Sequence, residues 1–274
     1  MDPRIETSLT RALETGDFRD LLERARPALG LPGPKPRLPF LRELGLAIAR
    51  DRAKGERLAR LLGASELEEA RVTSAGAFGA LATGAAGARK EALAALQELA
   101  DDARATIRFA VIDSVRRMLE ADVATTLADL TAWTDGFLQA HVALEAIREK
   151  KILDTVPNAA AVLALLEPAY RLADGAPRAA DRWQGVRVLR QGLPAQITAF
   201  VARFSELTAW LLERASAQRP ETREVLDQTA EALKRASFKG TEVDMLRDAL
   251  TKSAKPPRDP SRVVSGTRKR SKKG

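Results

Sequence analysis

The chain has 274 residues, a formal net charge of +8 and no cysteine. The lack of cysteine excludes disulfides, thiolate metal sites and a cysteine nucleophile. Residues 252–274, called the cationic segment below, hold nine Lys or Arg and one acid, so residues 1–251 contain equal numbers of acids and bases. The sequence therefore describes a neutral body followed by a strongly cationic end.

The N-terminal part, residues 1–39, reads as a first helical segment over residues 1–26 followed by a connector. Five prolines fall within thirteen residues: Pro27, Pro32, Pro34, Pro36 and Pro39. Prolines at this density stop a helix and predict a stiff, extended connector before Phe40. The first residues lack the layout of a signal peptide, and the longest uncharged run, residues 72–88, is too short and glycine-rich to span a bilayer. We expect a cytoplasmic protein with no membrane contact.

Residues 40–251 read as a succession of short helices. Apolar residues recur at spacings of three and four, Ala and Leu dominate, and no credible strand is present. The predicted helix stops are Gly63, Gly136, Pro157, Gly175, Pro177, Pro220 and Gly240. The glycines between Gly76 and Gly87 follow no strand and lack a Gly-Lys-Ser/Thr ending, so close helix packing explains them better than a phosphate loop.

One phrase recurs within this helical region. Leu-Thr-Ala-Trp at 130–133 returns at 207–210, 77 residues later, and Leu166 to Tyr170 lies halfway between the copies. The implied period of about 38 residues suits one two-helix unit of a solenoid, whose apolar faces are buried by stacking. We predict an all-α fold: an α/α superhelix of the HEAT/armadillo-like solenoid type over residues 40–251.

The spacing of polar residues supports the same fold. Asp102 is followed at five and six residues by Ile107 and Arg108, and the spacing recurs from Asp135 with His141 in the arginine position. This pattern resembles the Asp and Val-Arg spacing of HEAT repeats, which implies an arginine that bonds within or between repeats. His141 is the sole histidine, and no partner at ligand or triad spacing is visible, so we interpret it as structural.

The last third resembles a particular family. Asp181-Arg182-Trp183, then Val186-Arg187, then the second Leu-Thr-Ala-Trp phrase, are similar to the HEAT-like repeats of the DNA-alkylation-repair glycosylase superfamily, over roughly residues 58–250. The resemblance implies a groove for duplex DNA and, in active members, excision of alkylated purines by aromatic residues and a carboxylate without a metal. Trp183, Asp129 and Asp135 are the candidates for that role only if the protein is a glycosylase.

The three aromatic residues of the repeated phrase, Trp133, Tyr170 and Trp210, occupy equivalent repeat positions, so we predict that they pack in the core. Trp183 falls outside this register near a predicted helix start. It is therefore the best aromatic candidate for a surface contact with a nucleobase.

The cationic segment combines prolines with Ser, Gly and Lys and offers almost no apolar residues, so we expect a disordered basic tail. Counterion release favours docking of such a tail on phosphates. The predicted nucleic-acid contacts are Lys255, Arg258, Arg262, Arg268, Lys269, Arg270, Lys272 and Lys273 in the tail, and Arg108, Arg187 and Arg190, with Arg104 and Arg203, in the body.

The function favoured by these observations is nucleic-acid binding, with duplex DNA as the ligand and a link to DNA repair, without catalysis and without a cofactor or metal. Two alternatives stay open. One is an alkylpurine DNA glycosylase. The other is a protein–protein scaffold whose concave groove holds a partner helix.

Overall fold

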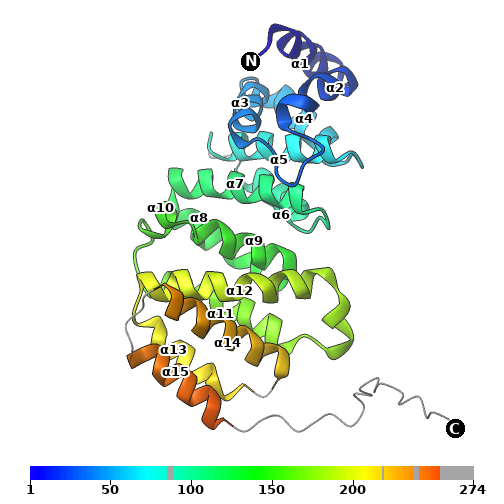
Figure 1. The fold of residues 1–274 in the computed structure, drawn as a ribbon. Coiled ribbons are helices and arrows are strands. Elements are labelled where there is room, and N and C mark those ends of the chain that lie inside the picture. Colours follow the sequence, from blue (N-terminus) through cyan, green and yellow to red (C-terminus); the bar gives the residue numbers. More distant parts are fainter. Residues whose placement is uncertain (85–88, 218, 237–240, 254–274) are drawn as a thin grey trace, which may run out of the picture.

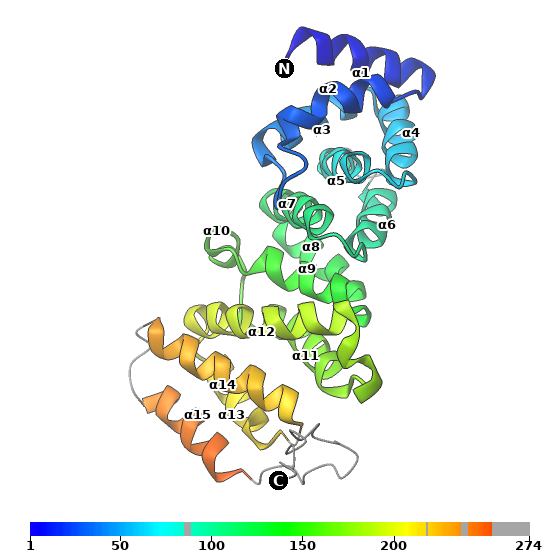
Figure 2. The same ribbon diagram turned by 45° about the vertical axis from the view of Figure 1, so that its right-hand side comes forward.

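A computed structural model describes residues 1–84, 89–217, 219–236 and 241–253, the side chains of residues 241 and 242 excepted. This part of the chain forms helices and no strands, and the helices stack into an elongated array (Figures 1 and 2). The predicted all-α solenoid is confirmed.

Two rows of helices make up the array. The first row consists of α3 (Leu38–Ala49), α5 (Glu68–Ala82), α7 (Ala105–Ala121), α9 (Phe137–Ile147), α12 (Gln184–Arg203) and α14 (Pro220–Arg235). Each of these helices packs against the next one in the row. The second row consists of α4 (Arg52–Gly63), α6 (Arg89–Ala100), α8 (Val123–Leu130) with the 3-10 helix η2 (Thr131–Asp135), α11 (Ala159–Gly175) with η3 (Arg178–Arg182), and α13 (Leu207–Glu213) with η4 (Arg214–Ser216). The short α10 (Lys150–Leu153) links α9 to α11.

Three further helices lie at the ends: α1 (Pro3–Thr15) and α2 (Arg19–Leu29) at one end and α15 (Thr241–Lys252) at the other (Figure 1). A single apolar core runs through the array from Ile5 to Leu250. The helices of residues 1–39 therefore share the core of the rest of the body. No helix in the described ranges has the length and hydropathy to cross a membrane.

The predicted helix stops agree with the observed ends. α4 ends at Gly63, Gly136 is the N-cap of α9, α11 ends at Gly175, and Pro220 is the first residue of α14. A glycine is tolerated where a helix must end, and proline at the first helical position loses no hydrogen bond because its missing N–H would have had no partner. Gly240 lies outside the described residues.

The N-terminal part differs from prediction in two ways. Gly16 adopts φ 81° and its N–H donates to Ala12 O at 2.8 Å, which ends α1 and starts a second helix within residues 1–26. The prediction of an extended connector is wrong, because Pro27 lies inside α2 and the chain turns back after it. The Arg37 N–H donates to Leu29 O at 2.8 Å, and Pro36 is buried.

The glycines of α5 are explained by close helix approach, as predicted. α5 is buried from Val72 to Ala82, between α3 and α7. A Cβ on Gly45 of α3 would lie 2.4 Å from Gly76 O, and a Cβ on Gly79 would lie 2.5 Å from Ser114 of α7. Ser114 also donates its hydroxyl to Ala75 O at 2.8 Å. Only small residues let three first-row helices come this close.

The repeated phrase marks successive second-row elements. Its first copy covers the end of α8 and η2, the second begins α13, and the middle aromatic lies in α11. Trp133, Tyr170 and Trp210 are 2%, 5% and 8% exposed, so the prediction that they are core residues is confirmed. The rings of Tyr170 and Trp210 meet edge to face with centroids 5.4 Å apart, which joins two neighbouring units.

Candidate nucleic-acid interface

The first-row helices start along one edge of the array, called the leading edge below. Arg104, the N-cap of α7, donates to Glu66 O just before α5 at 2.8 Å, and Gln184 of α12 donates to Ala103 O just before α7 at 2.6 Å. Gly185 of α12 is so close to Phe137 of α9 that an added Cβ would lie 3.0 Å from the phenylalanine Cβ. The starts of α5, α7, α9 and α12 are therefore neighbours in space.

These starts lack the usual side-chain caps. The N-caps of α5, α7, α9 and α12 are Leu67, Arg104, Gly136 and Trp183, and none of these residues caps its helix through a side chain. In contrast, Asp51, Asp122 and Asn158 cap the second-row helices α4, α8 and α11. The first turns of α7, α9 and α12 also contain no acid, so their N-terminal partial positive charges favour anions near this edge.

Three exposed side chains at the start of α12 form the strongest candidate surface, called the α12 patch below: Arg182, Trp183 and Arg187. Trp183 is 58% exposed, whereas the two other tryptophans are buried. Trp183 is the N-cap of α12, and Arg187 lies four residues later, at the end of the first turn of that helix. Within the described ranges, neither Arg182 nor Arg187 has an ion-pair partner.

The segment before α12 is held firmly. Arg190 pairs with Asp181 Oδ1 at 2.8 Å and donates to Ala173 O at 2.8 Å, which ties η3 and the end of α11 to α12. Ala176, Ala180 and Val186 form a small apolar cluster beside Phe137. The α12 patch therefore sits on a fixed turn rather than at a loose loop tip.

Two predicted phosphate contacts have internal roles instead. Arg108 is only 6% exposed and donates to the carbonyl oxygens of Asp102 and Ala103 at 2.6 and 2.8 Å. The Arg190 guanidinium binds Asp181 and the carbonyl oxygen of Ala173, as described above. Both belong to the body's internal bonding, so we remove them from the predicted contacts. The HEAT-like spacing had pointed to such a role for Arg108.

Two other body arginines are partly occupied. Arg104 pairs with Asp102 at 2.7 Å, and the guanidinium holds the pKa of that carboxyl below its usual value although burial acts in the opposite direction. Arg203 lies 3.8 Å from Asp154 and over the ring of Phe204. Of the predicted body arginines, Arg187 alone is exposed without an ion-pair partner in the described ranges. Arg182 belongs to the Asp181-Arg182-Trp183 motif but was not among the predicted contacts.

The carboxylates proposed for a glycosylase are separated by the fold. Asp129 in α8 pairs with Arg89 at 2.9 Å. Asp135 is exposed directly before Gly136, the N-cap of α9, so it lies on the leading edge beside the start of α12. Trp183 and Asp135 are therefore on the same edge, whereas Asp129 is bound elsewhere. Among the described residues no group of acids and histidine has the arrangement of a metal site.

His141 is half-buried at the interface between α9 and α12, in keeping with the structural role predicted for it. It faces Gln196 of α12, whose Nε2 lies 3.4 Å from His141 Nδ1, and a Cβ on Gly192 would lie 2.5 Å from the same nitrogen. Burial lowers the pKa of His141 to about 4. Burial also acts to raise the pKa of the neighbouring Glu145, but Arg148 outweighs it and holds that pKa below its usual value.

Glu167 fixes the aromatic pair of the repeat. Its carboxylate accepts from Trp210 Nε1 at 2.6 Å and from Arg214 at 2.5 Å, and the Arg214 guanidinium lies over the Trp210 ring. Trp210 thus has its polar atom satisfied inside the body. It offers no free face for a base.

The cationic segment begins at the end of α15. Lys252 is the last residue of that helix, and Arg223 of α14 donates to Leu250 O and to Ser253 Oγ, both at 2.5 Å. The predicted contacts from Lys255 to Lys273 lie outside the described residues. Of this segment, the structure describes Lys252 and Ser253.

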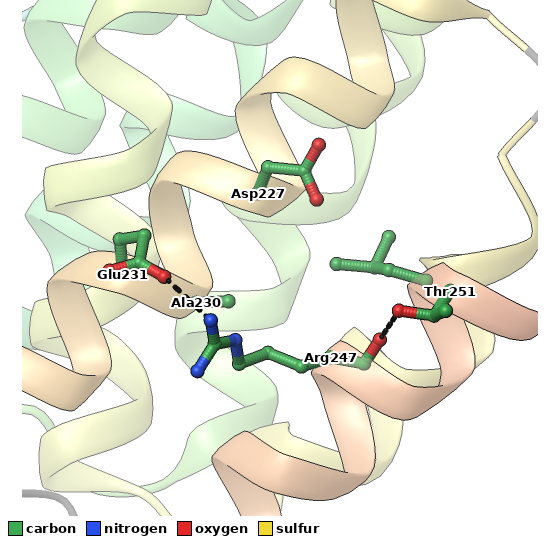
Figure 3. A pocket seen from close by; sticks show the side chains of 6 residues that line it. Asp227, Ala230, Glu231, Arg247 and Thr251 are labelled. Carbon is green, nitrogen blue, oxygen red and sulfur yellow. Dashed lines mark hydrogen bonds and ion pairs between the residues drawn. The ribbon is translucent and has the colours of Figure 1, made fainter.

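A cavity of about 310 Å³ lies between α14 and α15 (Figure 3). Asp227 and Glu231 face Arg247 and Thr251 across it, and Arg247 pairs with Glu231 at 3.3 Å. Its lining is largely polar and contains no aromatic residue. It is unlike the apolar, enclosed sites that hold small ligands.

Comparison with known proteins assigns the chain to no family. No protein family and no curated protein matches it. Among solved structures, a designed armadillo repeat protein is 17% identical, with a TM-score of 0.38 over 90% of this chain and 98% of that chain. An engineered protein is 16% identical, with a TM-score of 0.40 over 92% of this chain and 98% of that chain. The solenoid assignment rests on the helix contacts of this chain itself.

Proposed function

We propose that this protein binds nucleic acid, with duplex DNA as the preferred ligand, and that it acts as a binding protein rather than as an enzyme. The observation that carries the proposal is the α12 patch: an exposed tryptophan with an exposed arginine on each side of it in the sequence, on a fixed turn of the leading edge. The cationic segment supplies the long-range attraction.

The charge distribution supports this choice. Most arginines near the first row are engaged by acids or carbonyls, such as Arg42 with Asp113 and Arg116 with Glu149. Because the N–H groups of these arginines already have acceptors, they are poor ligands for a phosphate. Since Arg182 and Arg187 have no ion-pair partner among the described residues, their guanidinium groups can form bidentate bonds with phosphate oxygens, and the helix start beside them adds partial positive charge.

Trp183 adds a second kind of contact. An aromatic side chain this exposed is costly in water and is common where proteins meet a partner. Beside two arginines, its indole can pack against sugar or a base while the arginines fix the backbone. The combination favours nucleic acid over a simple anion such as free phosphate.

The experiment measures binding of a labelled 30-base-pair duplex by fluorescence anisotropy. The test variant is Arg182→Gln/Trp183→Ala/Arg187→Gln. The matched control is Arg50→Gln/Arg52→Gln/Leu46→Ala, which removes the same charge and an exposed apolar residue where α3 ends and α4 begins. We expect at least tenfold weaker binding for the test variant and less than a twofold change for the control. Equal weakening of both would refute a role for the α12 patch.

A glycosylase would give a further signal. Incubation of the protein with a duplex containing 7-methylguanine would release the base, and Asp135→Asn would abolish the release. We expect binding without release, because the described structure offers Asp135 at an exposed edge rather than in an enclosed pocket that could hold an extrahelical base.

A protein scaffold is the second candidate, and one observation favours it. A cavity of about 360 Å³ beside α4, α5 and α6 is lined by apolar residues that include Phe78, Ala95 and Leu99, and by the charged side chains of Arg60, Arg71, Glu91 and Glu98. A partner's apolar side chain would fit there. If Ala95→Glu abolishes capture of a protein partner while duplex binding is absent, the scaffold reading replaces the proposal.

A further inference from the structure

A groove lies on the second-row side of the array, between α4 and α6. Both helices pack on α5 and lie on the same side of it (Figure 2). The cavity of about 360 Å³ described above lies between them, and a second cavity of about 410 Å³ adjoins it, because Arg71 and Glu98 line both. The two cavities form one continuous surface, called the α4–α6 groove below.

The first cavity has an apolar floor and walls of small residues. Its floor includes Phe78 of α5 and Leu99 of α6, which are 2% and 3% exposed. The small residues of its walls are Gly63 and Ala64 at the end of α4, and Ala94 and Ala95 of α6. Because these side chains are short, they leave a hollow in which an apolar side chain of a partner would lose its contact with water.

Among the described residues that line the groove, only acids lack an ion-pair partner. Its three arginines already pair with acids at 2.7 to 3.1 Å: Arg60 with Glu56, and Arg71 and Arg104 with Asp102. Glu91, Glu98 and Asp101 are exposed and have no such partner in the described ranges. The charge that the groove offers to a partner is therefore negative.

The spacing of these acids follows the helix period. Glu91 and Glu98 lie two turns apart on α6, about 10 Å along its axis, with Ala94 and Ala95 between them on the same face. Asp101 follows directly after the last residue of α6. A hollow with a carboxylate one turn away on either side matches a helix that carries an apolar side chain with Lys or Arg one turn before and after it.

We infer that the α4–α6 groove binds a basic amphipathic helix of a partner protein, which inserts an apolar side chain over Phe78 and pairs its Lys or Arg residues with the three unpaired acids. This inference names a partner class for the cavity beside α4, α5 and α6, and it does not require duplex binding. Unpaired carboxylates repel phosphate, so the groove and the α12 patch serve different ligands.

The probe is a fluorescein-labelled, alanine-based helical peptide of 18 residues. It has one leucine at its centre, and arginines one and two turns away on both sides along the same face. Anisotropy titration with the full chain measures its affinity. We expect saturable binding that weakens about tenfold for Glu91→Gln/Glu98→Gln/Asp101→Asn, and about fivefold for Ala95→Leu, which fills the hollow without adding charge.

The matched control is Glu206→Gln/Glu224→Gln/Asp248→Asn, which removes three exposed acids near the C-terminal end of the array. We expect this control to change peptide affinity less than twofold. A second peptide of the same composition, with its arginines on the face opposite the leucine, should bind about tenfold more weakly. Equal weakening by the control variant, or equal affinity for the two peptides, would overturn the inference.

Two further outcomes identify other occupants or separate the two proposals. If removal of residues 254–274 tightens peptide binding about tenfold, the chain's own cationic segment occupies the groove, and the assignment to a partner is wrong. Duplex affinity of the Glu91→Gln/Glu98→Gln/Asp101→Asn variant should stay within twofold of the parent. Peptide binding without duplex binding would refute the proposed function and leave this inference standing.

Discussion

Replacing Gly45 by alanine tests the close packing of α3 against α5. Alanine is favoured over glycine inside a helix by about 1 kcal/mol, so propensity alone predicts stabilisation. The new Cβ would lie 2.4 Å from Gly76 O and 2.6 Å from its carbonyl carbon, whereas ordinary contact begins at 3.4 Å. Both neighbouring atoms belong to backbone, so α3 and α5 must separate by about 1 Å.

Separation at that point weakens a well-packed interface. Leu41, Leu44 and Ile48 of α3 are at most 1% exposed, so each loses contacts when the helix moves. Overpacking of this kind costs about 1–3 kcal/mol, and more where backbone must shift. After subtraction of the propensity gain, we expect Gly45→Ala to lower the free energy of unfolding by about 2 kcal/mol.

The assay is urea unfolding followed by circular dichroism. The control is Gly175→Ala at the end of α11, where an added Cβ meets no atom within 4 Å. That variant is expected to be neutral or stabilised by up to about 1 kcal/mol. If Gly45→Ala is as stable as the control, the argument that small residues set the spacing of α3 and α5 is wrong.

Three further predictions concern single residues. Trp133→Ala should cost about 3–5 kcal/mol in the same unfolding assay, because the indole is almost fully buried, whereas Trp183→Ala should change stability by less than about 0.5 kcal/mol; similar costs would contradict their placement. Arg108→Gln should lower the melting temperature in thermal unfolding and leave duplex affinity within twofold, since its guanidinium serves two backbone carbonyls; weaker binding at unchanged stability would return it to the interface. His141 has a folded pKa of about 4, below its unfolded value near 6.5, so the unfolded state gains the proton first on acidification. Its contribution should reduce stability by about 2 kcal/mol between pH 7 and pH 5, and His141→Gln should remove that part of the slope; an unchanged slope would show that the imidazole is solvated.

The helical array could be predicted because its signals are local. Apolar spacing, glycines and prolines at helix ends, and the recurring Leu-Thr-Ala-Trp phrase all act within a few residues, and the aromatic positions of that phrase proved to be core. The extended connector failed for the opposite reason. Proline content describes the chain by itself, whereas the closing bond from Arg37 to Leu29 and the burial of Pro36 depend on the helices around them.

The candidate interface could be predicted only in part. Trp183 was identified as a surface residue because it lies outside the repeat register, and the register is a property of the sequence. The choice among arginines could not be made, since an arginine bound to a carbonyl and an exposed one look the same in sequence. Only the structure distinguishes Arg108 and Arg190, which bind backbone carbonyls, from the exposed Arg187.

The binding of duplex DNA as a function of salt tests the proposed function most directly. The logarithm of affinity should fall with the logarithm of salt concentration at about 0.9 per phosphate neutralised, with a steep slope for the full chain and a slope smaller by several units for residues 1–253. Replacement of the α12 patch should weaken binding of residues 1–253 further. Absence of duplex binding at 50 mM salt, or identical slopes for the two chain lengths, would contradict the proposal that the cationic segment neutralises the phosphates.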